Sequence, residues 1–202
     1  MIVLNYKKTF FLKSVSKISD IKMSYGIEVA FIGYSNSGKS SAINALTNQK
    51  KIARFSKMPG RTQLINFFKI TSDFRIVDLP GYGYSQAPIS IKLKWEKILF
   101  NYLEKRKNLK ALVLLMDIRH PLKVFDYDII NISINLKIPI LLLLTKCDKL
   151  TTSKQKIQFN SVCKKVKQFS NINRVILFSS LKKIGVQKLR LTLDNWYNQY
   201  CE

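Results

Sequence analysis

Short apolar stretches alternate along the chain with segments in which apolar residues recur every third or fourth position. Apolar stretches of this length between turn-forming residues are typical of strands buried on both faces of a sheet. Six such strands are predicted, at residues 27–32, 64–70, 74–77, 111–116, 138–144 and 174–178. The helical spacing is clearest at Ile91, Trp95, Ile98, Leu99 and Tyr102, and again at Val186, Leu189, Leu193 and Trp196. We interpret both stripes as helix faces that pack on the core.

The order of these elements predicts an α/β fold. A turn at residues 71–73 joins the second and third strands as a hairpin, and helical segments separate the others. We therefore expect a mostly parallel six-stranded sheet with one antiparallel strand and helices on both faces, a three-layer arrangement. Residues 1–24 are expected to form an N-terminal extension packed on a single domain of residues 25–202. Ligands of such sheets bind at the carboxyl ends of the strands.

A phosphate-binding motif follows the first predicted strand. It reads Gly33-Tyr34-Ser35-Asn36-Ser37-Gly38-Lys39-Ser40 and matches G-x-x-x-x-G-K-[ST], and residues 41–46 continue as a predicted helix. The glycines let the backbone wrap around phosphate oxygens, which successive N–H groups hold. Lys39 would reach the β- and γ-phosphates, and the Ser40 hydroxyl would ligate Mg²⁺. The motif predicts a nucleoside triphosphate site without identifying the base.

Two further motifs end later strands. In Asp78-Leu79-Pro80-Gly81 the aspartate can hold Mg²⁺ through water, and the Gly81 N–H can meet the γ-phosphate. In Thr145-Lys146-Cys147-Asp148 the carboxylate can accept hydrogen bonds from N1 and N2 of guanine. Adenine lacks both donors, so it would leave Asp148 unpaired. The aliphatic stem of Lys146 can cover the base.

Weaker signals complete the set. Phe178-Ser179-Ser180 ends the last strand, where a backbone N–H could reach guanine O6, although an ordinary strand-to-helix loop would look the same. Gly60-Arg61-Thr62-Gln63-Leu64 lies between the first two motifs, and Thr62 is the candidate second protein ligand of Mg²⁺. Five motifs in this order, each at a strand end, predict a guanine-nucleotide-binding domain.

The expected roles are as follows. Lys39, Thr62 and Gly81 act on the reacting phosphate, and Ser40 and Thr62 ligate the metal. The residues expected to contact the nucleotide are Gly33, Tyr34, Ser35, Asn36, Ser37, Gly38, Lys39, Ser40, Ser41, Gly60, Arg61, Thr62, Gln63, Leu64, Asp78, Leu79, Pro80, Gly81, Thr145, Lys146, Cys147, Asp148, Phe178, Ser179 and Ser180.

The charge of the chain indicates a polyanionic partner but does not identify it. The formal net charge is +23 and the pI about 10.0, which favours RNA first and an anionic membrane second. A lysine-rich codon bias that loads every solvated face would give the same excess, and the two explanations stay open.

The remaining composition favours a cytoplasmic protein. Cys147, Cys163 and Cys201 are odd in number and widely spaced, which indicates neither a disulfide framework nor a zinc site. The longest apolar run, residues 138–144, is far shorter than the roughly 20 residues of a membrane span, and we identify no signal peptide. His120 is interpreted as a turn residue, because no cluster of His, Asp and Glu residues surrounds it in the sequence.

With these residues in view, the chain resembles the P-loop GTPases of the TrmE, Era, EngA, YihA and septin group, and within it the EngB (YihA/YsxC) family. The resemblance spans residues 28–196 and rests on residues 35–41, 59–63, 78–84, 116–122 and 178–182. It implies a Ras-like fold and a bacterial GTPase that acts in assembly of the large ribosomal subunit. We expect a monomer, and if its basic surface meets ribosomal RNA we expect contacts mostly to phosphates. The resemblance also implies a role in normal cell division and septation. Tyr34 departs from the family, which usually has arginine there.

Two residues bear on hydrolysis. Tyr82 follows Asp78-Leu79-Pro80-Gly81, where many GTPases have a glutamine that orients the attacking water. We therefore predict slow intrinsic hydrolysis, completed by a partner. Asn36 either supports a bound K⁺ that supplies charge to the transition state, as in relatives with asparagine at this position, or merely suits a tight turn.

Two other functions compete with a GTP-driven assembly factor. A P-loop kinase of small molecules would leave the guanine-reading motif without a purpose. A basic RNA-binding module with a regulatory or vestigial nucleotide site would explain the charge, but not the complete set of Lys39, Ser40, Thr62 and Asp78.

Overall fold

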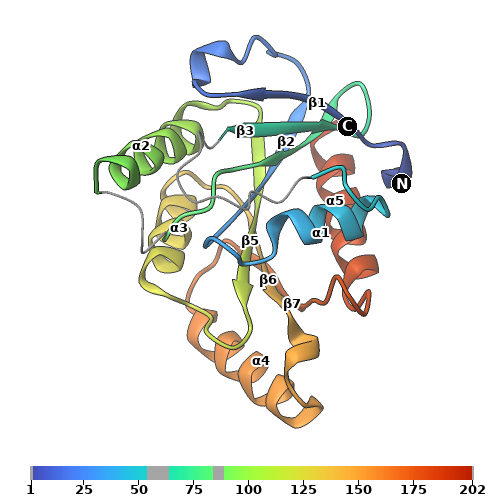
Figure 1. Cartoon of the computed structure of the whole chain (residues 1–202), viewed down its shortest axis with the longest axis vertical. Helices are drawn as coiled ribbons and strands as arrows, with labels where there is room; N and C mark the ends of the chain where they lie inside the picture. Colours follow the sequence, from blue (N-terminus) through green and yellow to red (C-terminus); the bar gives the residue numbers. More distant parts are fainter. Residues whose placement is uncertain (1, 54–63, 84–88, 202) are drawn as a thin grey trace.

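The structure, a computed structural model, describes residues 2–53, 64–83 and 89–201, and it forms a seven-stranded sheet between two helical layers (Figure 1). The strands are β1 (Phe10–Val15), β2 (Ile27–Gly33), β3 (Ile65–Lys69), β4 (Phe74–Asp78), β5 (Leu109–Asp117), β6 (Ile140–Thr145) and β7 (Ile172–Leu177). The helices are α1 (Lys39–Thr47), α2 (Ile89–Lys105), α3 (Val124–Asn135), α4 (Thr152–Val166) and α5 (Val186–Cys201). Short 3₁₀ turns lie at Tyr6–Lys8, Ile18–Asp20 and Cys147–Lys149.

The sheet has the order β1-β3-β4-β2-β5-β6-β7. β3 runs antiparallel to both of its neighbours, and the other pairs are parallel. The predicted α/β class, with a mostly parallel sheet and one antiparallel strand, is confirmed.

The predicted number of six strands is wrong, because Phe10–Val15 adds an edge strand, β1, beside β3. Its sequence contains apolar residues, Phe10, Phe11, Leu12 and Val15, but they follow neither strict alternation nor a continuous run, and five of the six residues are exposed or half-buried. A register shift between Phe11 and Lys13 interrupts the ladder further. An irregular edge strand of this kind depends on pairing with β3 rather than on burial.

The two faces of the sheet carry separate cores. On one face α2, α3 and α4 pack through residues such as Tyr102, Ile129 and Val162. On the other face α1 and α5 pack through residues such as Leu46 and Trp196. This arrangement is the predicted three-layer order. The α5 stripe lies in it, as do Ile98, Leu99 and Tyr102 of the α2 stripe, whereas the side chains of Ile91 and Trp95 are not among those described.

The N-terminal residues lie close to the C-terminal helix, as Figure 1 shows. The Tyr6 hydroxyl donates to Asp194 Oδ1 at 2.8 Å, and the backbone N–H of Ile2 donates to Asn198 Oδ1 at 2.8 Å. The parallel strands β2, β4, β5 and β6 end at one edge of the sheet, as the pairs Phe31–Asp78, Gly33–Leu115 and Asp117–Thr145 indicate. The motifs that begin at Gly33, Asp78 and Thr145 therefore lie where ligands of such sheets bind.

Candidate functional site

The chain turns sharply at residues 34–38, between β2 and α1. Asn36 and Gly38 have left-handed backbone there, with φ of 63° and 98°. A β-carbon on Gly33 would lie 2.3 Å from the carbonyl oxygen of Leu115, so only glycine fits at the end of β2. The backbone conformation thus folds the motif over the end of its strand.

Backbone N–H groups of this turn are available to an anion. Within the part of the chain that the structure describes, the N–H groups of Asn36 and Gly38 have no hydrogen-bond acceptor. The N–H groups of Lys39, Ser40 and Ser41 lie in the first turn of α1, where a helix offers no internal acceptor. Together with the positive end of the helix dipole, these donors can hold phosphate oxygens.

Lys39 and Asp78 bring an amine and a carboxylate to this edge of the sheet. Lys39 Nζ donates to the carbonyl oxygen of Gly33 at 3.2 Å, and burial lowers its pKa, against the effect of Asp78. Burial raises the pKa of Asp78 to about 6, while Lys39 and a hydrogen bond with Asn66 oppose that rise. Among the described residues, Asp78 Oδ1 has no hydrogen-bond partner although it is buried. A carboxylate oxygen without a donor beside a phosphate cradle fits a hard cation such as Mg²⁺.

The segment after β4 lies directly on the phosphate-binding turn. The N–H of Ser35 donates to the carbonyl oxygen of Tyr82 at 2.8 Å, and the N–H of Tyr82 donates to that of Gly33 at 3.4 Å. A β-carbon on Gly81 would lie 2.8 Å from Lys39 Nζ and 3.2 Å from Ser35 Cα. The backbone of Gly81 thus approaches both the amine of Lys39 and the phosphate-binding turn closely, with little space for a side chain.

The Tyr82 side chain extends away from the phosphate-binding turn to the start of α3. Its hydroxyl donates to Asp126 Oδ1 at 2.7 Å, and its ring stacks on Phe125 with centroids 5.1 Å apart. The Tyr34 ring packs edge-on against the Tyr82 ring, with centroids 4.6 Å apart. Lys123 Nζ lies 4.5 Å from the centroid of the Tyr34 ring. Burial raises the pKa of Asp126 to about 6, although the hydrogen bond from Tyr82 lowers it. Tyr82, the residue that follows Gly81, thus contacts the first turn of α3.

The loop after β6 is tied to the same turn. Thr145 Oγ1 donates to the carbonyl oxygen of Ser37 at 2.6 Å, and Lys146 Nζ donates to that of Asn36 at 2.7 Å. Lys146 Nζ also lies 3.1 Å from Asp117 Oδ2, at the end of β5. Arg119 binds both oxygens of Asp117, at 2.9 and 2.6 Å. Burial raises the Asp117 pKa, but hydrogen bonds from Arg119 and Lys146 outweigh it and hold the pKa well below its usual range.

Asp148 lies beside the loop that follows β7. Its Oδ1 accepts a hydrogen bond from Ser179 Oγ, which in turn accepts from the N–H of Lys182 at 3.1 Å. The N–H of Cys147 donates to the carbonyl oxygen of Phe178 at 3.2 Å. The structure therefore brings together the two loops that the sequence analysis assigned to the base.

Other expected contacts have the following positions. Leu79 and Pro80 are buried between Asp78 and Gly81, and Ser180 follows Ser179 in the loop after β7. Leu64 lies directly before β3. Gly60, Arg61, Thr62 and Gln63 lie outside the described residues. Within those that are described, no three His, Cys, Asp or Glu side chains gather as a metal cluster.

Sequence reasoning missed the functional neighbours that come from other elements. Asp126 and Phe125 meet Tyr82 from α3, and Asp117 meets Lys146 from β5. No local pattern marks Asp126 or Phe125. Asp117 and Arg119 lie in a segment that carried the family resemblance, which is the signal by which they could have been found.

A family model described as "50S ribosome-binding GTPase" matches residues 28–146. The chain is 67% identical over 200 residues to a probable GTP-binding protein EngB of Buchnera aphidicola subsp. Schizaphis graminum, covering 99% of this chain and 100% of that protein. It is 53% identical over 196 residues to the protein of that description from Escherichia coli O157:H7, covering 97% of this chain and 93% of that one.

Solved structures agree on the fold. A probable GTP-binding protein EngB has a TM-score of 0.68 at 22% identity, over 85% of this chain and 99% of that one. A point variant of Aquifex aeolicus Era bound to GDP·AlF₄⁻ has a TM-score of 0.66 at 22% identity, over 86% of this chain and 57% of that one. No helix in the described ranges is long and apolar enough to cross a membrane. On the family model and the curated relatives, the chain belongs to the EngB family of GTP-binding proteins, which are GTPases.

Proposed function

We propose that this GTPase is a nucleotide-gated factor in assembly of the large ribosomal subunit, and that normal cell division and septation depend on it. The observation that carries the gating is the backbone pairing of Ser35 with Tyr82 beside Lys39. A γ-phosphate on this turn would act on the Gly81 segment, and Tyr82 would pass that change to α3 through Asp126. The partner assignment is supported by the family model's description as a ribosome-binding GTPase.

Different residues of the site bind the phosphates, the metal ion and the base. The free N–H groups of Asn36, Gly38 and residues 39–41 hold the phosphates, with the Lys39 amine on the β- and γ-phosphates. Ser40 and Thr62 would ligate Mg²⁺, and Asp78 would hold it through water, which fits a buried carboxylate oxygen that has no donor among the described residues. When bound, Mg²⁺ offsets charge on the phosphate oxygens.

On the base side, Asp148 accepts from guanine N1 and N2, and Lys146 covers the ring. The backbone N–H of Ser180 binds guanine O6, because the N–H of Ser179 already donates to the carbonyl oxygen of Ile184 at 3.0 Å. The loop positions support this division, because Lys146 and Thr145 both bond to carbonyl oxygens of the phosphate-binding turn. We also propose that the protein is a cytoplasmic monomer.

Hydrolysis is slow in this proposal until a partner completes the site. The Tyr82 hydroxyl donates to Asp126 on α3, so it does not orient a water at the phosphate. Charge stabilisation is left to Lys39, to Gly81 and to the backbone cradle. Turnover by the purified chain as fast as that of an activated GTPase would refute this.

Potassium is the proposed source of additional charge, with Asn36 as its support in the phosphate-binding turn. The left-handed backbone of Asn36 is equally suited to the turn alone. Turnover should be measured in K⁺ and in Na⁺ at one ionic strength. Faster turnover in K⁺ supports the proposal, and equal rates contradict it.

The test of the main proposal is co-sedimentation with large ribosomal subunits and their precursors. Binding should be compared in GDP and in a non-hydrolysable GTP analogue, across a salt series. Binding that needs the analogue and persists at moderate salt supports the gated factor.

The second candidate function is a basic RNA-binding module with a regulatory nucleotide site, favoured by the net charge of +23. This function predicts binding that ignores the nucleotide and disappears as salt rises, because it is purely electrostatic. The same co-sedimentation series separates the two.

A further inference from the structure

Positive charge is concentrated in the last third of the chain. Residues 149–193 contain eleven lysines and arginines and no aspartate or glutamate, although the chain has 12 acidic residues in all. Residues 29–72 also lack acidic residues but contain only seven lysines and arginines, so residues 149–193 differ from them by a higher density of positive charge. This last segment includes α4, which has no acidic residue from Thr152 to Val166.

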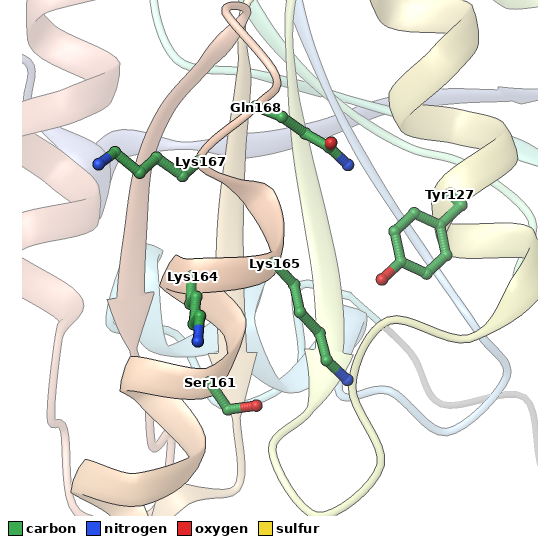
Figure 2. Close-up of a pocket in the computed structure, with 6 residues that line it drawn as sticks. All are labelled: Tyr127, Ser161, Lys164, Lys165, Lys167 and Gln168. Atoms are coloured by element: carbon green, nitrogen blue, oxygen red, sulfur yellow. The ribbon is translucent and has the colours of Figure 1, made fainter.

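A hollow between α4 and α3 lies within this basic region. Its volume is about 790 Å³, and its lining residues are Tyr127, Ser161, Lys164, Lys165, Lys167 and Gln168. In Figure 2, Lys165 on α4 and Gln168 just beyond the end of α4 extend toward Tyr127, whereas Lys167 points to the other side. The three lysines are exposed, and none of them forms an ion pair with any described residue.

The helix dipole explains only part of this arrangement. Lys164 and Lys165 lie in the last turn of α4, where cations are favoured at the negative end of a helix. Lys167 is the C-cap residue of the same helix, so the dipole favours all three lysines there, but it does not account for a half-buried tyrosine that faces them. The combination of amines, a hydroxyl, an amide and an aromatic ring is the set of groups that binds phosphate, sugar and base.

We propose that this hollow is the surface through which the chain binds the phosphodiester backbone of RNA. A ridge of phosphates fits a concave basic surface, whereas a flat anionic bilayer would contact only its rim. The proposal deepens the proposed function and rests on it, because the RNA expected there is that of the large ribosomal subunit.

The position of the hollow also connects it to the nucleotide site. Tyr127 follows Asp126, which accepts the hydrogen bond from Tyr82, and its ring lies 6.4 Å from that of Phe169 beyond the end of α4. A shift of Tyr82 with the nucleotide state would act on the turn of α3 that carries Tyr127. The RNA surface is thus coupled to the segment that approaches the γ-phosphate.

The test compares two triple variants of equal charge change. The first carries Lys164→Gln, Lys165→Gln and Lys167→Gln, and the control carries Lys7→Gln, Lys8→Gln and Lys50→Gln. The control lysines are exposed near α1, on the opposite face of the sheet. Exposed substitutions of this kind change stability by at most about 0.5 kcal/mol, so both variants should fold.

Binding to large subunits, to ribosomal RNA extracted from them and to anionic vesicles should be measured as a function of salt. The logarithm of the binding constant falls linearly with the logarithm of the salt concentration, with a slope of about 0.7 for each phosphate contact. Loss of three contacts should reduce this slope by about 2, which weakens RNA binding on the order of 100-fold at 0.1 M salt. The control should change far less, and GTP affinity should stay the same in both. Tyr127→Leu should weaken RNA binding and Tyr127→Phe should not, because stacking needs only the ring.

The outcomes separate the two proposals. Equal RNA binding by the two triple variants, or a preference of the wild type for vesicles over RNA, would overturn the proposal that the hollow binds RNA. If the wild type binds subunits and both triple variants bind them equally well, the hollow is not the RNA-binding surface, while the proposed function stands. If the wild type binds extracted RNA through the hollow but binds no subunits, the proposed function fails and the RNA surface stands.

Discussion

Replacement of Glu28 by glutamine tests the buried ionic network that supports β2, the strand that leads into the phosphate-binding turn. Glu28 is fully buried, and its carboxylate receives Arg75 Nε at 3.3 Å, Arg106 Nε at 2.8 Å and the Tyr102 hydroxyl at 2.7 Å. The two arginine side chains are only 5% and 10% exposed. They also donate to the carbonyl oxygens of Tyr25 and Met23, just before β2.

The glutamine amide keeps the shape but removes the negative charge that two buried guanidinium groups share. Breaking a buried pair by removing one partner costs about 3–5 kcal/mol, because the remaining charge is left uncompensated. That is a large share of a stability of roughly 5–15 kcal/mol. With a urea dependence of about 2 kcal/mol per M, the unfolding midpoint should fall by about 1.5–2.5 M.

The assay is urea unfolding followed by circular dichroism, without nucleotide so that ligand binding does not mask the change. Glu104→Gln is the matched control, because Glu104 is exposed on α2 and the charge change is identical. The control should lose no more than about 0.5 kcal/mol. A loss below about 1 kcal/mol for the Glu28 variant would refute the reasoning.

Three further predictions concern the site. Tyr82→Phe removes the hydrogen bond to the buried Asp126 carboxylate, so unfolding at pH 7 should require about 1.5–3 kcal/mol less, and the loss should be smaller at pH 5, where Asp126 is protonated. Because burial raises the Asp126 pKa to about 6 in the folded chain, this group's stabilisation is full below pH 4 and is lost as pH rises through 6. In the wild type this effect should lower the free energy of unfolding by about 3 kcal/mol between pH 4 and pH 7, and Asp126→Asn should remove that decrease. An unchanged decrease in the variant would show that Asp126 is not its cause. Asp117→Asn frees Lys146 from a half-exposed ion pair worth about 0.5–1 kcal/mol, so GDP should bind about 2–5-fold more weakly by equilibrium titration, and equal affinity would show that Asp117 does not position Lys146.

The parts of the site that could be predicted from the sequence are those whose geometry is local. The turn at residues 33–40 is set by its own glycines and by the helix that follows, so the motif alone locates it. The buried strands could be predicted because a continuous run of apolar residues is typical of a strand that is covered on both faces of the sheet. Their carboxyl ends therefore indicated where the site would lie.

The parts that could not be predicted depend on contacts between distant segments. Asp126 meets Tyr82 across 44 positions, and Lys146 bonds Asn36 across 110 positions. Neither pairing leaves a periodic signal in the chain. β1 was missed for a related reason, because an exposed edge strand is stabilised by its partner and not by a buried face.

The most direct test of the central claim uses the reciprocity of linked binding. If a GTP analogue strengthens binding of the chain to large ribosomal subunits, the subunits must strengthen binding of the analogue by the same factor. The measurement is the dissociation constant of a fluorescent GTP analogue, with GDP as the control, in the absence and presence of saturating subunits. The account predicts that subunits tighten the analogue at least about 5-fold and leave GDP unchanged. Equal effects of the subunits on both nucleotides, or no effect on either, would contradict a nucleotide-gated factor.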